Sequence, residues 1–106
     1  MTIAIIAGRP YTTETATEVA EWSNNYYPGD FNFCQERLYR TPKGAWFTCG
    51  SGGAASKYAT SAYGGGWTGQ NDVITPLSEH EAQAWLEQRG DVEAIGTYFG
   101  DNVEDA

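Results

Sequence analysis

The order of apolar and polar residues along the chain predicts a mixture of strands and helices. The run Thr2–Ala7 is short, apolar and rich in β-branched residues, which predicts a buried strand. Thr12 or Thr13 is a suitable N-cap after the Gly8-Arg9-Pro10 break, and we expect a helix from there to about Asn25. The inward face of this helix would consist of Ala16, Val19, Ala20 and Ser23, with Trp22 beside it.

The middle of the chain has the pattern of a β-hairpin. Phe31–Arg40 predicts a strand, although its imperfect alternation indicates a bulge or two partly covered faces. The segment Thr41-Pro42-Lys43-Gly44 is typical of a type I turn, with Pro second and Gly fourth. Ala45–Cys49 then predicts the returning strand.

The glycine-rich segment that follows predicts less regular structure. Ala54–Ala62 could form a short helix, and residues 63–71 indicate an exposed loop that carries Trp67. Val73–Thr75 predicts a short strand stopped by Pro76.

The C-terminal segment has two clear helix starts. Ser78 and Glu81 have the spacing of a capping box, and Gly90 is placed to end the helix in the left-handed conformation. Asp91 can cap a final short helix, after which an acidic tail from about Gly100 should be frayed. The predicted inward residues of the two helices are Ala82, Trp85, Leu86, Val92, Ile95, Tyr98 and Phe99.

Together these elements predict a single α+β domain over residues 1–106. We expect a small antiparallel sheet, made of the N-terminal strand, the central hairpin and a short strand, packed against two or three helices. Hydrophobic residues make up 41% of the chain and aromatic residues 14%, which is too much apolar material for a disordered protein. No apolar run approaches the roughly 18 residues of a spanning helix, and we expect no signal peptide and no membrane contact.

Charge is distributed unevenly. The net charge is −8, and residues 1–71 contribute nothing to it because five acids balance five bases there. Residues 72–106 hold nine acids and only one base, Arg89. Direct binding to a phosphate backbone needs clustered Lys and Arg, so we expect no direct nucleic-acid contact and a basic protein partner instead.

The candidates for catalysis and metal binding are few. In the simplest register of the hairpin, Cys49 lies opposite Glu36 and not opposite Cys34, so we expect two free thiols in a cytoplasmic protein. His80, the only histidine, lies beside two glutamates in a first helical turn, where a solvated side chain is the usual finding. One His and two separated Cys fall short of a four-ligand zinc set. We expect no metal, no cofactor and no enzymatic activity.

Two further patterns are better explained by local structure than by a binding site. Gly50–Ala55 matches the G-x-G-x-x-A of dinucleotide sites, but the preceding strand belongs to an antiparallel hairpin, and a crowded turn explains the glycines better. Arg37, Arg40 and Lys43 form a small basic cluster near the hairpin tip, where a solvated turn is favoured over an anion site.

Carboxylates and one aromatic residue are the candidate partner-binding groups. Glu14, Glu18 and Glu21 recur at helical spacing, as one row on the expected first helix. A solvated helix face is the simpler reading of such a row. The concentration of the excess charge in residues 72–106 nevertheless favours a binding surface. Repulsion among these acids weakens the fold and nothing in the core requires them, so a role in binding would explain why they are there. The candidate residues are Glu14, Glu18, Glu21, Glu79, Glu81, Glu87, Asp91, Glu93 and, as an aromatic anchor, Trp67. The alternative for Trp67 is that it folds back and covers a hydrophobic edge.

Four stretches of this sequence resemble a set of small acidic proteins carried by phages and other mobile elements. The stretches are Thr13–Ala16 with Glu18–Ala20, Leu38–Gly44, Gly52-Gly53 with Ser56–Ala59, and Pro76–Glu79 running to Trp85–Glu87. They consist of caps, a turn and glycines, so the resemblance bears more on fold than on activity. Several such proteins are anti-CRISPR inhibitors that imitate DNA.

The resemblance implies an inhibitor that acts in the host cytoplasm on a basic nucleic-acid-binding surface. A type I CRISPR-Cas surveillance complex or its nuclease would be the target, with carboxylates taking the place of phosphates. One alternative is an antitoxin or regulatory module that binds through Trp67 and the hairpin. A second is a small enzyme that uses Cys34 or Cys49.

Overall fold

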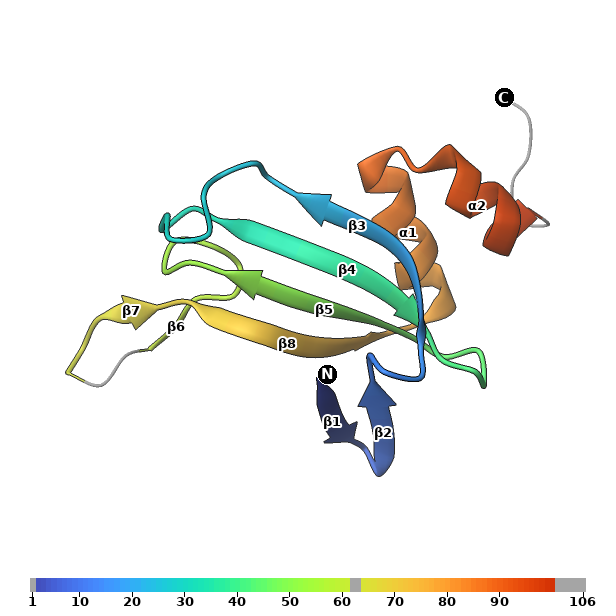
Figure 1. The fold of residues 1–106 in the computed structure, drawn as a ribbon, viewed down its shortest axis with the longest axis horizontal. Coiled ribbons are helices and arrows are strands. Elements are labelled where there is room, and N and C mark those ends of the chain that lie inside the picture. Colours follow the sequence, from blue (N-terminus) through green and yellow to red (C-terminus); the bar gives the residue numbers. More distant parts are fainter. Residues whose placement is uncertain (1, 62–63, 101–106) are drawn as a thin grey trace.

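A four-stranded antiparallel sheet is the centre of the molecule. The computed structural model describes residues 2–61 and 64–100. The main sheet has the order β3 (Thr17–Ser23), β4 (Cys34–Arg40), β5 (Trp46–Gly52) and β8 (Gln70–Leu77). Its two helices lie near the end of the sheet where β4 turns into β5 (Figure 1). The α+β class with a small antiparallel sheet and two helices is confirmed.

Residues 3–12 form a hairpin, and residues 2–25 contain no helix. β1 (Ile3–Ile6) pairs with β2 (Arg9–Thr12), and the two turn residues Ala7 and Gly8 both have positive φ, 52° and 76°. Two positive φ angles are the signature of a type I′ turn, whose twist suits a two-residue hairpin. The expectation of a buried first strand is wrong, because Ile3 and Ile5 are 59% and 75% exposed. The expected place of this strand in the main sheet is also wrong, because β1 pairs only with β2, in a separate two-stranded sheet.

The predicted helix from Thr12 or Thr13 to Asn25 is also wrong, because its second half is strand β3. A bulge between Glu18 and Ala20 interrupts the alternation along this strand. One extra residue at a bulge shifts the two-residue alternation of a strand, so that over a short stretch the apolar residues have the spacing of a helix. This shift explains why the segment was predicted to be helical. The many Thr and Val residues of this segment favour extended backbone.

The central hairpin is confirmed, with its register shifted by one residue. Gly44 N–H donates to the Thr41 carbonyl (2.9 Å), and Gly44 then adopts a φ of 89°. This extra left-handed residue places Cys49 opposite Arg37, and not opposite Glu36 as the simplest register predicted. The strand also begins at Cys34, so the predicted start at Phe31 was too early.

The segment between β5 and β8 contains no helix among its described residues. Residues 54–58 form turns and bends, β6 (Thr60–Ser61) pairs with β7 (Trp67–Thr68), and Ala62 lies outside the described residues. Strand β8 extends well beyond the predicted Val73–Thr75 and continues through Pro76, which an edge strand tolerates.

The helical predictions for the C-terminus are confirmed. α1 (Glu79–Arg89) begins with the capping box of Ser78 and Glu81 and ends at Gly90, whose φ is 68°. α2 (Val92–Phe99) is capped by the Asp91 carboxylate, which accepts from Ala94 N–H. The predicted tail beyond Gly100 lies outside the described residues.

The main sheet has a core on each face. On the helix face, Leu38 and Trp46 pack with Ala82, Trp85 and Leu86 of α1 and with Phe99 of α2. On the other face, here called the hairpin face, Tyr39 and Phe47 pack with Tyr11 of β2. Val92, predicted to point inward, is 78% exposed, while Ile95 and Tyr98 are half-buried.

Candidate partner-binding surface

The two helices expose carboxylates and direct their only Lys or Arg inward. Their acids, here called the acidic helical layer, are the exposed Glu79, Glu81, Glu87 and Glu93 and the half-buried cap Asp91. The only base of α1 and α2, Arg89, has a side chain that is 17% exposed and forms an ion pair with Glu36 of β4. The solvent-facing charges of α1 and α2 are therefore negative.

Two members of the acidic helical layer also have structural roles. Glu81 accepts from Ser78 N–H at 2.9 Å, and Asp91 accepts from Ala94 N–H at 3.1 Å. The bonds to Ser78 lower the pKa of Glu81, which keeps that carboxylate charged. The side chains of Glu79, Glu87 and Glu93 form no ion pair within the described part of the chain, so no neighbouring cation neutralises them.

The remaining candidate acids lie elsewhere, so the expected helical row of Glu14, Glu18 and Glu21 does not exist. Glu14 lies in the turn after β2. Glu18 and Glu21 lie on β3, and the bulge brings both to Arg37 of β4, at 3.6 and 3.2 Å. Since all three side chains of this cluster are about half exposed, the pairs add little stability but neutralise much of the local charge.

A buried carboxylate, which the sequence did not single out, fixes the helices to the sheet. The Glu36 side chain is 1% exposed and accepts four hydrogen bonds. Its Oε1 accepts from Arg89 Nη2 (2.7 Å) and Trp85 Nε1 (3.2 Å) of α1. Its Oε2 accepts from Lys57 Nζ (2.9 Å) and from the hydroxyl of Tyr58.

These partners keep Glu36 ionised. Burial by itself would raise the pKa of Glu36, but the hydrogen bonds from Tyr58, Lys57 and Trp85 and the charge of Lys57 outweigh burial and hold the pKa below its usual value. Burial and the bond to Glu36 raise the pKa of Tyr58, which therefore stays a donor.

Arg89 is held by two aromatic rings as well as by Glu36. The centre of its guanidinium lies 4.5 Å from the Trp22 ring centroid and 4.7 Å from that of Trp85. A guanidinium suits such a site because it is planar and weakly hydrated. The α1–β4 contact thus removes from the helix surface the one cation that would offset its acids.

The other predicted anchor, Trp67, is exposed as expected, although it lies in strand β7 and not in a loop. Trp67 is 68% exposed, and Tyr26, Tyr27 and Phe31 of the β3–β4 loop are 51%, 85% and 71% exposed. Figure 1 places that loop and β7 at the end of the sheet farthest from the helices. The structure therefore does not bring Trp67 together with the acidic helical layer.

The glycines of Gly50–Ala55 serve close packing, as predicted. A Cβ on Gly50 would overlap the ring of Tyr58, and one on Gly53 would overlap the carbonyl groups of Asp30 and Phe31. The backbone here turns against its neighbours and forms no cradle that opens a helix. The predicted basic cluster is also divided, since Arg37 pairs with acids on the hairpin face while Arg40 lies over the rings of Trp46 and Tyr98.

The cysteines are free, as predicted, and their environment does not activate them. Burial, followed by the charge of Glu36, raises the pKa of Cys34. Burial, followed by the charge of Asp72, raises the pKa of Cys49. A nucleophilic thiol needs the opposite shift. Exposed His80 stands at the start of α1, and within the described ranges no His, Cys, Asp or Glu group is arranged to hold a metal ion.

Thiol labelling near pH 7.5 should therefore be slow at both positions. We expect the Cys34→Ser and Cys49→Ser variants, each with one thiol, to react with a disulfide reagent more slowly than free cysteine, and Cys34 more slowly than Cys49 because it is buried. The same variants in denaturant should react at the free-cysteine rate. Faster reaction of either folded variant would restore the small-enzyme hypothesis.

Comparisons with known proteins give no relative. No family model, no curated protein and no solved structure matches this chain. Neither of the helices in residues 2–61 and 64–100 has the length and apolar character needed to cross a membrane.

Proposed function

We propose that this protein binds a basic, nucleic-acid-binding surface of another protein through its acidic helical layer and thereby competes with nucleic acid. The single observation that carries the proposal is the inward placement of Arg89, which leaves α1 and α2 with no exposed Lys or Arg. Isolated acids on a protein surface are ordinary, but a helical layer without any counter-charge has a sustained negative potential.

The proposed surface includes fewer residues than the sequence predicted. Glu79, Glu81, Glu87, Asp91 and Glu93 form its core, whereas Glu18 and Glu21 are partly neutralised by Arg37. Opposite charges would steer the two proteins together and make association fast and sensitive to salt.

The target class follows from the resemblance to small acidic proteins of phages and mobile elements. We propose an anti-CRISPR inhibitor that acts on a type I CRISPR-Cas surveillance complex or its nuclease, with helical carboxylates in place of DNA phosphates. The protein itself contacts no nucleic acid in this mechanism.

Competition for a labelled DNA target tests the proposal. At low salt, an excess of the protein should displace DNA from a type I surveillance complex or its nuclease, and the apparent affinity should fall by about tenfold or more between 50 and 200 mM salt. A protein that never displaces DNA from such complexes at low salt is not an inhibitor of this kind.

Two triple variants with the same net charge locate the surface. Glu79→Gln, Glu87→Gln and Glu93→Gln together should weaken the competition on the order of a hundredfold, if each carboxylate contributes about 1 kcal/mol. Glu14→Gln, Glu18→Gln and Glu21→Gln remove the same charge elsewhere and should weaken it much less. Equal losses would show that binding follows net charge and not the helical layer.

A second candidate function rests on the exposed aromatic side chains at the other end of the sheet. Trp67 and Tyr27, at 68% and 85% exposed, are typical anchors of protein interfaces. They favour an antitoxin or regulatory module whose binding tolerates salt. Partner capture that is lost in Trp67→Ala and kept in the Glu79, Glu87 and Glu93 variant would favour this function over the first.

A further inference from the structure

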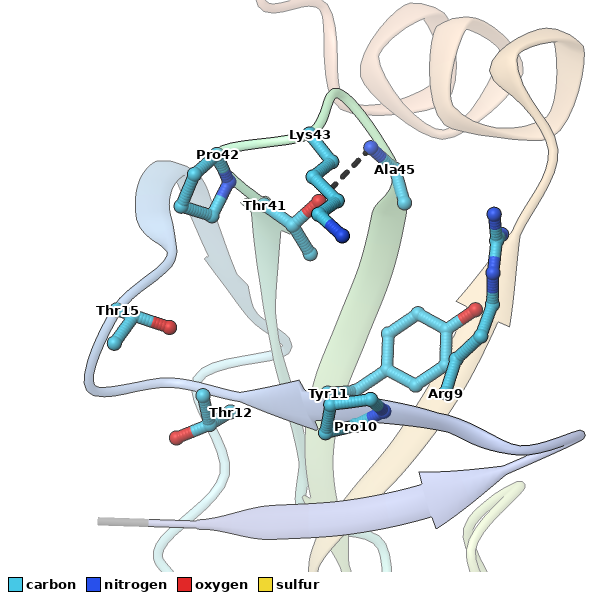
Figure 2. Close-up of a pocket in the computed structure, with 9 residues that line it drawn as sticks. All are labelled: Arg9, Pro10, Tyr11, Thr12, Thr15, Thr41, Pro42, Lys43 and Ala45. Atoms are coloured by element: carbon cyan, nitrogen blue, oxygen red, sulfur yellow. Dashed lines mark hydrogen bonds between the residues drawn. The ribbon is translucent and has the colours of Figure 1, made fainter.

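A pocket of about 340 Å³ lies between the β1–β2 hairpin and the β4–β5 turn. Lys43 extends from the turn toward Tyr11, and Arg9 stands beside the Tyr11 ring (Figure 2). We propose that this pocket binds a small organic phosphate, such as an aryl or sugar phosphomonoester. This inference is independent of the acidic helical layer.

The charge of the pocket is the first reason. Arg9 and Lys43 line it, no acid lines it, and neither cation forms an ion pair within the described residues. The other cations are engaged: Arg37, Lys57 and Arg89 pair with carboxylates, and Arg40 lies over two rings. In a chain of net charge −8, two unpaired cations share one cavity.

The hydroxyl groups of the pocket are the second reason. Thr41 Oγ1 accepts a hydrogen bond from Ala45 N–H at 3.0 Å, so its own proton remains free to donate. Figure 2 shows the Thr15 hydroxyl directed toward the space between the hairpin and the turn. Two cations and two hydroxyl donors suit a group that only accepts hydrogen bonds, as a phosphate dianion does.

The walls of the pocket indicate an organic phosphate instead of inorganic phosphate. Tyr11 is 7% exposed, and its ring packs edge-on against Phe47 with centroids 5.6 Å apart, which fixes one wall. The rings of Pro10 and Pro42 add rigid apolar surface. A preformed pocket with apolar walls and a few polar groups is typical of small-molecule sites.

Titration with phenyl phosphate, followed by NMR of the backbone amides, tests the proposal. We expect saturable shifts confined to residues 9–15 and 41–45. Arg9→Gln and Lys43→Gln should each weaken binding on the order of tenfold, because each removes a charge-assisted hydrogen bond. Phenol and inorganic phosphate should both bind more weakly than phenyl phosphate.

Arg40→Gln is the matched control. Arg40 belongs to the same turn region and also lacks an ion pair, but its guanidinium lies over Trp46 and Tyr98 on the helix face. Arg40→Gln should leave phenyl phosphate binding within about twofold of the wild type. No saturable shift at residues 9–15 and 41–45 with millimolar phenyl phosphate would overturn the proposal, and so would equal weakening by all three variants.

Discussion

Replacing Glu36 with glutamine should lower the free energy of unfolding by about 3 kcal/mol, because it breaks a buried ion pair and leaves a cation without its counter-charge. Glu36 is 1% exposed, and Arg89, at 17% exposed, lies close to the rings of Trp22 and Trp85, which leave little room for water to replace the carboxylate. The amide of glutamine would also present N–H groups to donors such as Tyr58 and Lys57. Urea unfolding followed by Trp fluorescence measures the change.

Glu21→Gln is the control for this substitution. Glu21 pairs with Arg37 on the neighbouring strand, at 3.2 Å, but both side chains are about half exposed. The expected loss is below about 1 kcal/mol, because water screens the pair. A Glu36→Gln protein as stable as the Glu21→Gln protein would mean that the network of Glu36 does not hold the helices to the sheet.

The effect of Glu36→Gln should depend on pH in a defined direction. The pKa of Glu36 is lower in the folded state than in the unfolded chain, so its ionisation stabilises the fold fully above the unfolded pKa of about 4.3. That contribution is lost as the pH falls through the folded pKa. The stability difference between wild type and Glu36→Gln should be constant from pH 8 to about pH 6 and decrease below about pH 4.

Replacing Gly50 with alanine should lower the free energy of unfolding by about 2 to 3 kcal/mol. Gly50 lies opposite Glu36 in the β4–β5 register, and its missing side chain leaves the space that the Tyr58 ring occupies. An added Cβ would overlap the ring and push its hydroxyl away from Glu36. The change is measured by urea unfolding, as for Glu36.

Two further variants separate this steric effect from the intrinsic effect of alanine. Gly29→Ala adds a methyl group where no atom lies within 4 Å, and it should change stability by less than about 0.5 kcal/mol. In a Tyr58→Ala background, Gly50→Ala should be nearly neutral, because the overlapping ring is gone. A full loss in both backgrounds would assign the effect to the strand backbone.

The features that the sequence predicted well are those decided by neighbouring residues. The capping box of Ser78 and Glu81, the stop at Gly90 and the turn at Thr41–Gly44 each need contacts within four or five residues, so their signals are local. The exposure of Trp67 among glycines and the acidity of the last third belong to the same class. Composition by itself shows the excess of acids, whereas the inward placement of Arg89, which carries the proposed function, depends on the tertiary structure.

The features that the sequence predicted poorly depend on pairing between strands that are far apart along the chain. Residues 17–23 fit a helix by spacing, and only pairing with β4 and the bulge at Glu18/Ala20 made them a strand. The single extra residue at Gly44 shifted the whole hairpin register, which moved Cys49 opposite Arg37 and Glu36 opposite Gly50. A bulge adds one residue and leaves the pattern of residue types almost unchanged, so the sequence hides it.

The sequence by itself determined the α+β class, the two C-terminal helices, the hairpin turn and the negative charge of the final third. Only the tertiary structure decided that Glu36 is buried and that Arg89 turns away from solvent, because the four partners of Glu36 lie 21 to 53 residues away along the chain. Tertiary packing also joined Arg9 and Lys43 at one pocket. Local patterns report on neighbours along the chain, whereas burial and charge pairing are set by segments that meet only in the folded protein.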